Sequence, residues 1–206
     1  MVYVLGFFTA DGNMIKNRRG AHFIEFQITD KDLLEKIRGL LSSNHKIAVH
    51  KRNSRWKMLY RLQIGSKTIF NDLLKLGLTP NKSKTIRLPN VPNEYFHHFL
   101  RGYFDGDGRV SFGIYPRKTR KSKIRLLNTR FISGNKKFLE NLLITLKKYS
   151  DLKGGFIVKK NRGFELSFSI NDSKKLYKFM YEGVTNNIFL ERKYNKFQDA
   201  LKYLGA

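Results

Sequence analysis

The sequence predicts an α+β fold built from two pseudo-symmetric halves, each of the pattern αββαββα with one curved antiparallel sheet. The first observation is a repeat: Gly-aromatic-Phe, two residues and an Asp-Gly pair occur at residues 6–12 and again at 102–108. The second is that the same order of apolar periodicities follows each copy. The third is that short Ser-Lys and Gly-x-Thr segments recur at similar spacing in both halves.

In the first half, a short apolar helix ends at the first Asp-Gly pair, and strand-like and helix-like segments alternate after it. Asp30 occupies the N-cap position ahead of a run with helical apolar period. Alternation of apolar and polar residues marks the strands. The predicted elements are strands at 13–19 and 22–29, a helix at 30–41, strands at 47–52 and 58–64, and a helix at 67–76.

The second half repeats this plan, with Asn135 at the matching N-cap position. Its last strand places Phe164, Leu166, Phe168 and Ile170 on one side, opposite Glu165, Ser167 and Ser169. The half has about ten extra residues, which we expect in the loop at 116–122. The predicted elements are strands at 109–115 and 124–133, a helix at 135–149, strands at 156–160 and 164–170, and helices at 173–182 and 187–204.

The segment 88–93 predicts the boundary between the halves. It contains two of the four prolines of the chain, and proline interrupts both helices and strands. We therefore expect an N-terminal half-domain at 1–87, a short linker at 88–93 and a C-terminal half-domain at 94–206.

The chain is strongly basic, with 41 Lys and Arg residues against 16 Asp and Glu and a net charge of +25. Such a charge favours a polyanionic partner, and nucleic acid is the first candidate. A membrane surface would call for a basic amphipathic helix or a polybasic tail, and the sequence has neither. The polar face of each predicted sheet is a candidate groove for DNA, or else an ordinary solvated face.

The chain contains no cysteine, which excludes disulfides and thiolate metal sites. Five histidines are present, but none has zinc-binding spacing. The sequence shows no signal peptide or long apolar span. We therefore expect an intracellular protein, in the cytoplasm or an organelle, and not a secreted one.

Small residues recur at helix-packing spacing in both motifs. Gly6 and Ala10 are four residues apart, as are Gly102 and Gly106, so the two motif helices can approach closely. Their ends would then place Asp11 beside Asp107, and two carboxylates there repel each other unless a divalent cation lies between them. Mg²⁺ with carboxylate and carbonyl ligands suits phosphodiester hydrolysis. A single Asp-Gly pair would more simply be a helix-ending turn.

Segments 4–12 and 100–108 resemble the two motifs of the LAGLIDADG homing endonucleases of the monomeric two-motif type, and the resemblance extends over almost the whole chain. It implies a DNA-binding saddle of two sheets with the motif helices at the centre. It also implies cleavage of both strands of a long target, leaving short 3′ overhangs. The metal would be Mg²⁺ or Mn²⁺, with Ca²⁺ as a non-catalytic substitute, held by Asp11, Asp107 and the carbonyls of Ala10 and Gly106. Thr9 departs from the family motif, at a position that we expect to matter little.

The same resemblance implies a basic residue beside each active site, which corresponds to Lys82 and Lys193. Each would stabilise phosphate charge or polarise the attacking water; the alternative for each lysine is a plain electrostatic contact with phosphate. Asp30 and Asn135 match positions that order water in the family, besides being N-caps.

Side chains on the outward face of each sheet are candidate base and phosphate contacts, because they include the donors and acceptors that recognise base edges. The two halves differ at nearly all of these positions, so the target should be asymmetric. The candidates are Asn13, Ile15, Asn17, Arg19, Glu25, Gln27, Arg61 and Gln63 in the first half, and Arg109, Ser111, Gly113, Tyr115, Arg117, Asn128, Arg130, Ser167 and Ser169 in the second.

The sequence favours a monomeric DNA endonuclease encoded by an intron, an intein or a free gene. An RNA-splicing maturase or a non-cleaving DNA-binding protein on the same scaffold is the alternative. A basic structural or ribosome-associated protein is a third possibility, but such a protein has no use for paired acids.

Overall fold

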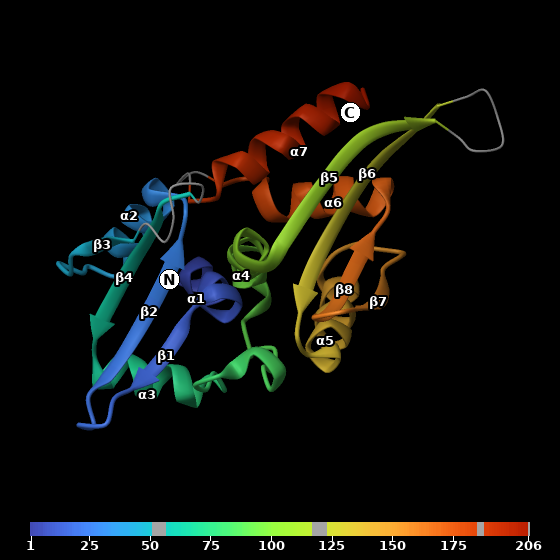
Figure 1. Cartoon of the computed structure of the whole chain (residues 1–206). Helices are drawn as coiled ribbons and strands as arrows, with labels where there is room; N and C mark the ends of the chain where they lie inside the picture. Colours follow the sequence, from blue (N-terminus) through green and yellow to red (C-terminus); the bar gives the residue numbers. More distant parts are fainter. Residues whose placement is uncertain (51–56, 117–122, 185–187, 206) are drawn as a thin grey trace. The chain divides into compact units, whose positions relative to one another are not determined.

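A computed structural model describes residues 1–50, 57–116, 123–184 and 188–205. The chain divides into two compact units, Met1–Gly106 and Asp107–Ala206. Each unit contains one four-stranded antiparallel sheet (Figure 1). The helices and strands follow the order αββαββα in both parts of the chain, which confirms the predicted α+β fold.

The first sheet has the strand order β1-β2-β4-β3. Its register places Asn13 opposite Glu25, and Glu25 opposite Gln63. Helix α4 reaches across the boundary between the units and ends at Asp107. The elements are α1 (Val2–Asp11), β1 (Asn13–Lys16), β2 (His22–Ile28), α2 (Lys31–Leu40), β3 (Ile47–His50), β4 (Leu59–Gly65), α3 (Lys67–Lys75), the 3-10 helix η1 (Lys82–Lys84) and α4 (Asn93–Asp107).

The second sheet has the order β5-β6-β8-β7, which repeats the topology of the first. Arg109 lies opposite Arg130, and Arg130 opposite Ser167. This row therefore corresponds to Asn13, Glu25 and Gln63 in the first sheet. The elements are β5 (Gly108–Pro116), β6 (Lys123–Ser133), α5 (Lys136–Tyr149), β7 (Phe156–Lys160), β8 (Gly163–Phe168), α6 (Ile170–Tyr181) and α7 (Glu191–Tyr203).

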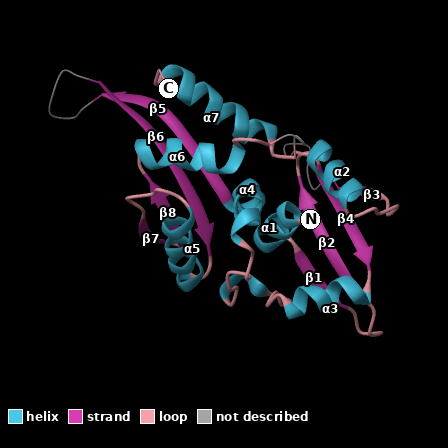
Figure 2. Ribbon diagram, turned by 180° about the vertical axis from the view of Figure 1, so that it is seen from behind, coloured by secondary structure: helices cyan, strands magenta, loops and turns pink. Residues whose placement is uncertain are grey.

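The core of the first unit lies between its sheet and helices α1, α2 and α3 (Figure 2). Ile24, Phe26 and Leu62 are buried on the helix-covered face. Two aromatic residues of α1 pack on this face, with the rings of Phe7 and Phe8 centred 6.4 and 5.2 Å from that of Phe26. The apolar motif helix therefore belongs to the core, because burying such aromatic surface is the main favourable term in folding.

The core of the second unit is formed in the same way. Phe131, Leu166 and Phe168 are buried beneath α5 and α6. The opposite face of each sheet, here called the open face, carries the alternate residues, including Glu25 in the first unit and Arg130 in the second. In the described part of the chain, no helix combines the length and the apolar character that crossing a bilayer requires.

The first strand is shorter than predicted. Strand β1 ends at Lys16, because the Asn17 carboxamide closes a turn by accepting hydrogen bonds from the backbone N–H groups of Arg19 (3.0 Å) and Ala21 (2.9 Å). Gly20 completes the turn with φ at +82°. The predicted strand at 13–19 was therefore wrong at its end, and Asn17 and Arg19 belong to the turn.

The end of the second sheet also differs from the prediction. Strand β8 ends at Phe168, and helix α6 begins at Ile170 instead of residue 173. Ser66 caps α3 by accepting from the N–H of Ile69 at 3.2 Å, but Ser173 lies buried inside α6 and is not its counterpart. The Ser173 hydroxyl instead accepts from the N–H of Thr129 at 3.0 Å and ties the helix to β6.

Most other boundaries fall within one or two residues of the prediction. Helix α7 is an exception, since it starts at Glu191 and not at 187. The extra length of the second half lies in the β5–β6 hairpin, whose strands have 9 and 11 residues where β1 and β2 have 4 and 7. Residues 117–122 of the predicted loop lie outside the described residues.

Candidate functional site

Helices α1 and α4 pack in direct backbone contact, side by side in Figures 1 and 2. A Cβ atom added to Gly6 would lie 2.0 Å from the carbonyl oxygen of Phe99, and one added to Gly102 would lie 2.0 Å from that of Tyr3. Both distances are far inside van der Waals contact, so only glycine permits this approach. We call this contact the α1–α4 seam.

The seam continues to the ends of both helices. A Cβ added to Gly106 would lie 2.4 Å from the Cβ of Ala10 and 3.2 Å from Oδ2 of Asp11. Gly6, Ala10, Gly102 and Gly106 therefore all lie along the contact line. The carboxylate of Asp11 rests against the last turn of α4, one residue before Asp107.

Asp11 is the last residue of α1, and its side chain is exposed. The N–H of Gly12 donates to the carbonyl of Phe8 at 2.9 Å, and Gly12 then adopts an extended backbone that leads into β1. The Asp-Gly pair thus ends the helix and also leaves a carboxylate accessible at that end. Asp107 is partly exposed at the matching end of α4.

Lys82 lies at the same end of α1. Its side chain is only 7% exposed, and its ammonium group donates a hydrogen bond to the carbonyl oxygen of Gly12. The nitrogen also lies 5.2 Å from the centroid of the Phe8 ring. Helix η1 therefore fixes a buried cation next to the residue that follows Asp11.

Lys193 on α7 is buried to the same extent, also at 7%. Lysine is among the residues least often buried. Two lysines in matching segments of the two units, both removed from solvent, are not ordinary surface cations.

A polar network that the sequence did not predict crosses the seam. The hydroxyl of Tyr3 donates to Oδ2 of Asp105 at 2.7 Å. Arg101 is fully buried, with its guanidinium carbon 5.6 Å from the centroid of the Tyr3 ring. The only sequence signal for this network was the spacing of Arg101 and Asp105, which lie one helical turn apart within an apolar helix.

Arg101 also donates to Nδ1 of His98 at 2.9 Å. Burial, together with the neighbouring His97 and the positive charge of Arg101, lowers the pKa of His98 to about 4. His98 is therefore neutral at pH 7. A neutral imidazole nitrogen can accept the guanidinium N–H, which agrees with the observed contact.

We expect Tyr3→Phe to lower the melting temperature. The substitution keeps the ring but removes one donor from the buried carboxylate of Asp105, which should cost ~1–3 kcal/mol and thus about 3–9 °C in a chain of this size. A circular dichroism melt measures this change. Tyr95→Phe on the exposed side of α4 is the matched control. Equal melting temperatures for the two variants would show that the Tyr3–Asp105 bond does not hold the seam.

The open face of the first sheet gathers most of the predicted DNA contacts of that half. One row of the register contains Asn13, Glu25 and Gln63, and the next contains Gln27 and Arg61. The neighbouring row contains Ile15, which is partly exposed. Asn17 and Arg19 lie in the turn beyond the sheet, and both are exposed.

On the open face of the second sheet, Arg109 and Tyr115 are exposed, whereas Ser111, Gly113 and Arg130 are partly exposed. The Asn128 side chain is engaged within the protein, because its amide donates to the carbonyl of Phe168 at 2.8 Å and its oxygen accepts from Nε of Arg130 at 2.6 Å.

Three further residues of the second half that were predicted to contact DNA are not found as exposed side chains on the described part of the open face. Ser167 lies on the open face but is buried. Ser169 lies beyond the strand, at the N-cap of α6. Arg117 lies outside the described residues.

Apolar side chains also occupy the open face of the second sheet, and the sequence did not predict them as DNA contacts. Phe156 is 57% exposed and lies opposite Ser167, and Val158 and Ile132 flank Glu165 in the next row. The period-2 alternation of β7 was the signal that could have identified Phe156 and Val158.

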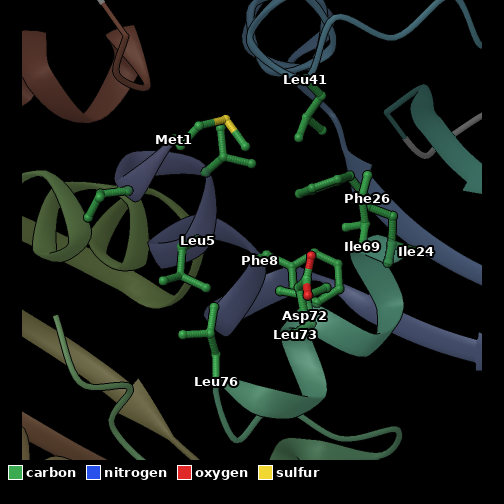
Figure 3. A pocket seen from close by; sticks show the side chains of 12 residues that line it. Met1, Leu5, Phe8, Ile24, Phe26, Leu41, Ile69, Asp72, Leu73 and Leu76 are labelled. Atoms are coloured by element: carbon green, nitrogen blue, oxygen red, sulfur yellow. The ribbon is translucent and has the colours of Figure 1, made fainter. Parts of the chain in front are cut away.

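The first unit also contains an apolar cavity of about 270 Å³ behind α1 (Figure 3). Met1, Leu5, Phe8 and Leu73 are among its lining residues. Asp72 is the one polar lining residue, and its carboxylate accepts from Nζ of Lys75 at 2.9 Å. This cavity therefore lacks the groups needed for metal or acid–base chemistry.

No group of three or more His, Cys, Asp or Glu side chains is placed to hold a metal ion within the described ranges. The end of α1 offers oxygen donors, because Asp11 is exposed there and the main-chain carbonyls of the last turn, including that of Ala10, have no partner farther along the helix. Such a sparse set of hard ligands fits Mg²⁺, which retains several waters and takes phosphate oxygens as further ligands.

Two motif helices, α1 and α4, each end in an acid and are each followed by the element order ββαββα, which defines a two-motif LAGLIDADG protein. The model of the LAGLIDADG endonuclease family matches residues 100–204, and the model of a LAGLIDADG-like domain matches residues 1–85. The chain therefore belongs to the LAGLIDADG endonuclease family, as the resemblance of its motifs predicted.

The curated relatives are proteins of Methanocaldococcus jannaschii. The chain is 26% identical over 156 residues to a probable translation initiation factor IF-2, with 72% of this chain but 11% of the relative covered. It is also 26% identical over 152 residues to the DNA-directed RNA polymerase subunit Rpo1C, with 72% and 16% covered. The chain thus spans only a small part of the length of these relatives.

Solved structures with the same fold include DNA-bound meganucleases. I-AabMI bound to uncleaved DNA gives a TM-score of 0.66 at 17% identity, with 98% of this chain and 90% of that chain covered. I-SmaMI bound to uncleaved DNA in the presence of calcium ions gives 0.65 at 14% identity, with 98% and 90% covered. The I-LtrWI homing endonuclease bound to target DNA gives 0.64 at 14%, with 99% and 90% covered.

Proposed function

We propose that this chain is a site-specific endonuclease that hydrolyses both strands of a long, asymmetric DNA duplex and leaves short 3′ overhangs. The observation that carries the proposal is the end of α1, where the exposed Asp11 carboxylate lies against Gly106 while the buried Lys82 ammonium is fixed to the carbonyl of Gly12. An accessible acid and a desolvated cation at one helix end are suited to phosphodiester chemistry.

In this proposal, Asp11 and Asp107 hold a divalent metal, with the carbonyls of Ala10 and Gly106 as further ligands. Bound Mg²⁺ or Mn²⁺ would neutralise charge that develops on the phosphate, and Ca²⁺ would bind without supporting cleavage. Lys82 would polarise the attacking water or stabilise phosphate charge at one strand, and Lys193 would act in the same way at the other.

DNA binding by this chain is supported by its net charge of +25 and by the polar side chains of both open faces. The two faces differ at equivalent positions, since the row that contains Glu25 in the first unit contains Arg130 in the second. The opposite charges at these matching positions give the two open faces different recognition surfaces. This difference supports an asymmetric target cut by one copy of the chain.

The genetic context is a separate proposal. The matched segments of the two curated relatives form a small fraction of much longer proteins, as expected for an endonuclease segment inserted into a host protein. We therefore favour encoding within an intein over encoding within an intron or by a free gene. We also propose an intracellular site of action, where the chain would meet its DNA target.

The test is cleavage of a randomised duplex library by the purified protein. We expect one family of asymmetric sites to be recovered with Mg²⁺ or Mn²⁺, and no cleavage with EDTA or with Ca²⁺ alone. Sequencing of the cut ends should show short 3′ overhangs. Binding preference without cleavage in any metal would instead support a non-cleaving DNA-binding protein, and cleavage in EDTA would contradict the metal mechanism.

A further inference from the structure

Glu25 stands out among the predicted DNA contacts because it is a charged residue that is almost completely buried. The residue is 5% exposed, in the middle of the open face of the first sheet. Its Oε1 accepts from Nε2 of Gln27 at 2.7 Å, and its Oε2 accepts from Nε2 of Gln63 at 3.3 Å. Arg61 adds a guanidinium nitrogen 3.8 Å from Oε2. Both carboxylate oxygens are therefore engaged by side chains of the same face.

These contacts fix the direction of both glutamine amides. A glutamine can normally rotate its amide by half a turn and exchange its donor for its acceptor. A carboxylate offers only acceptors, so the NH₂ groups of Gln27 and Gln63 must face Glu25. A rotated amide would instead place its oxygen against a carboxylate oxygen at hydrogen-bond distance, which is repulsive.

We propose that Glu25 is a positioning residue for base recognition: it holds Gln27 and Gln63 so that their carbonyl oxygens are presented to DNA. This inference rests on the proposed function. Each glutamine keeps its acceptor and one further N–H for a base. An acceptor with fixed direction favours bases whose major-groove edge donates, through N6 of adenine or N4 of cytosine, over guanine and thymine at the same position.

The second sheet has no equivalent arrangement among these rows. Arg130 and Ser167 occupy the positions that match Glu25 and Gln63. Glu165 there pairs with the cations of Arg130 and Lys160 at 3.8 and 3.9 Å. Loss of the Glu25 carboxylate should therefore alter recognition only in the part of the target that the first sheet contacts.

The experiment compares the binding preferences of wild type, E25Q and a Q27A/Q63A variant, each selected on a randomised duplex library in calcium buffer. Gln has nearly the size of Glu but can turn either group toward its neighbours. We expect E25Q to reduce the preference for donor-bearing bases about 5- to 10-fold at the base pairs that Q27A/Q63A also affects. All other base pairs should keep their wild-type profile.

E165Q is the matched control, since it removes the same charge from the open face of the second sheet. It should raise non-specific affinity as E25Q does, but leave the Gln27 and Gln63 base pairs unchanged. A wild-type profile in E25Q, or changes at base pairs that Q27A/Q63A does not affect, would overturn the inference. Should E25Q fail to fold, E25D replaces it, because its shorter carboxylate withdraws from both amides. If the wild type itself selects no sequence, the proposed function fails and this inference fails with it.

Discussion

Gly102→Leu is expected to abolish cooperative folding of the first unit. A Cβ at this position already lies 2.0 Å from the carbonyl oxygen of Tyr3 and 2.8 Å from the nitrogen of Phe7. Both atoms belong to the backbone of α1, so no side-chain rotation relieves the clash, and α1 and α4 must separate. Even Gly102→Ala should cost ~3 kcal/mol or more, equivalent to a loss of about 6–12 °C in melting temperature.

Gly39→Ala provides the control for this prediction. Gly39 lies in α2, and an added Cβ there meets nothing within 4 Å. Because alanine favours the helix over glycine, this variant should melt at or slightly above the wild-type temperature. Melting curves followed by circular dichroism at one protein concentration measure both variants. A Gly102→Ala protein as stable as Gly39→Ala would show that the seam adapts to a larger residue.

The seam was predictable because the property that creates it is local. Glycine or alanine at positions four apart lies on one helix face, whatever surrounds the helix, and Gly6 and Gly102 occupy the contact. The strand pattern was equally visible, since the alternation that ends at Phe168 reflects burial against α5 and α6. Because the same order of helices and strands follows each motif, a common topology for the two sheets was predictable as well.

The polar contacts were not predictable, because they depend on partners far apart in the sequence. Nothing near Tyr3 indicates that its hydroxyl meets Asp105, which is 102 residues away. Ser173 resembles Ser66 in its Ser-Lys context, yet only the buried N–H of Thr129 explains why it lies inside α6. Asn17 similarly ended β1 through a turn that strand alternation alone does not reveal.

The two motif copies differ at the position two residues before the last acid, which is Thr9 in the first copy and Asp105 in the second. From the sequence we expected this difference to matter little, but the two side chains make different contacts. Thr9 donates to the carbonyl of Leu5 within its own helix at 2.7 Å. Asp105 at the equivalent position accepts from Tyr3 of the other helix. The departure of Thr9 from the motif thus leaves only one of these two positions joining the helices. The seam is asymmetric although its glycines are matched.

Asp11→Asn and Asp107→Asn are each expected to remove DNA cleavage while folding and DNA binding persist. The amide keeps the shape of the carboxylate but lacks the charge that holds a divalent metal. Loss of a residue that merely orients a metal ligand costs 10- to 100-fold in metal affinity or activity, so loss of a ligand itself should cost at least about 100-fold in cleavage rate. Removal of a negative charge should, in addition, slightly strengthen DNA binding.

The measurement is single-turnover cleavage of the selected site, with binding followed in parallel in calcium buffer. Asp72→Asn is the matched control, because Asp72 is exposed on α3 and pairs with Lys75, so its cleavage rate should remain that of the wild type. Each motif variant should melt near the wild-type temperature, since Asp11 is exposed and its loss leaves the glycine contacts of the seam intact. A variant that cuts both strands at the wild-type rate would remove that acid from the mechanism. A variant that cuts one strand normally would instead assign the two acids to separate strands.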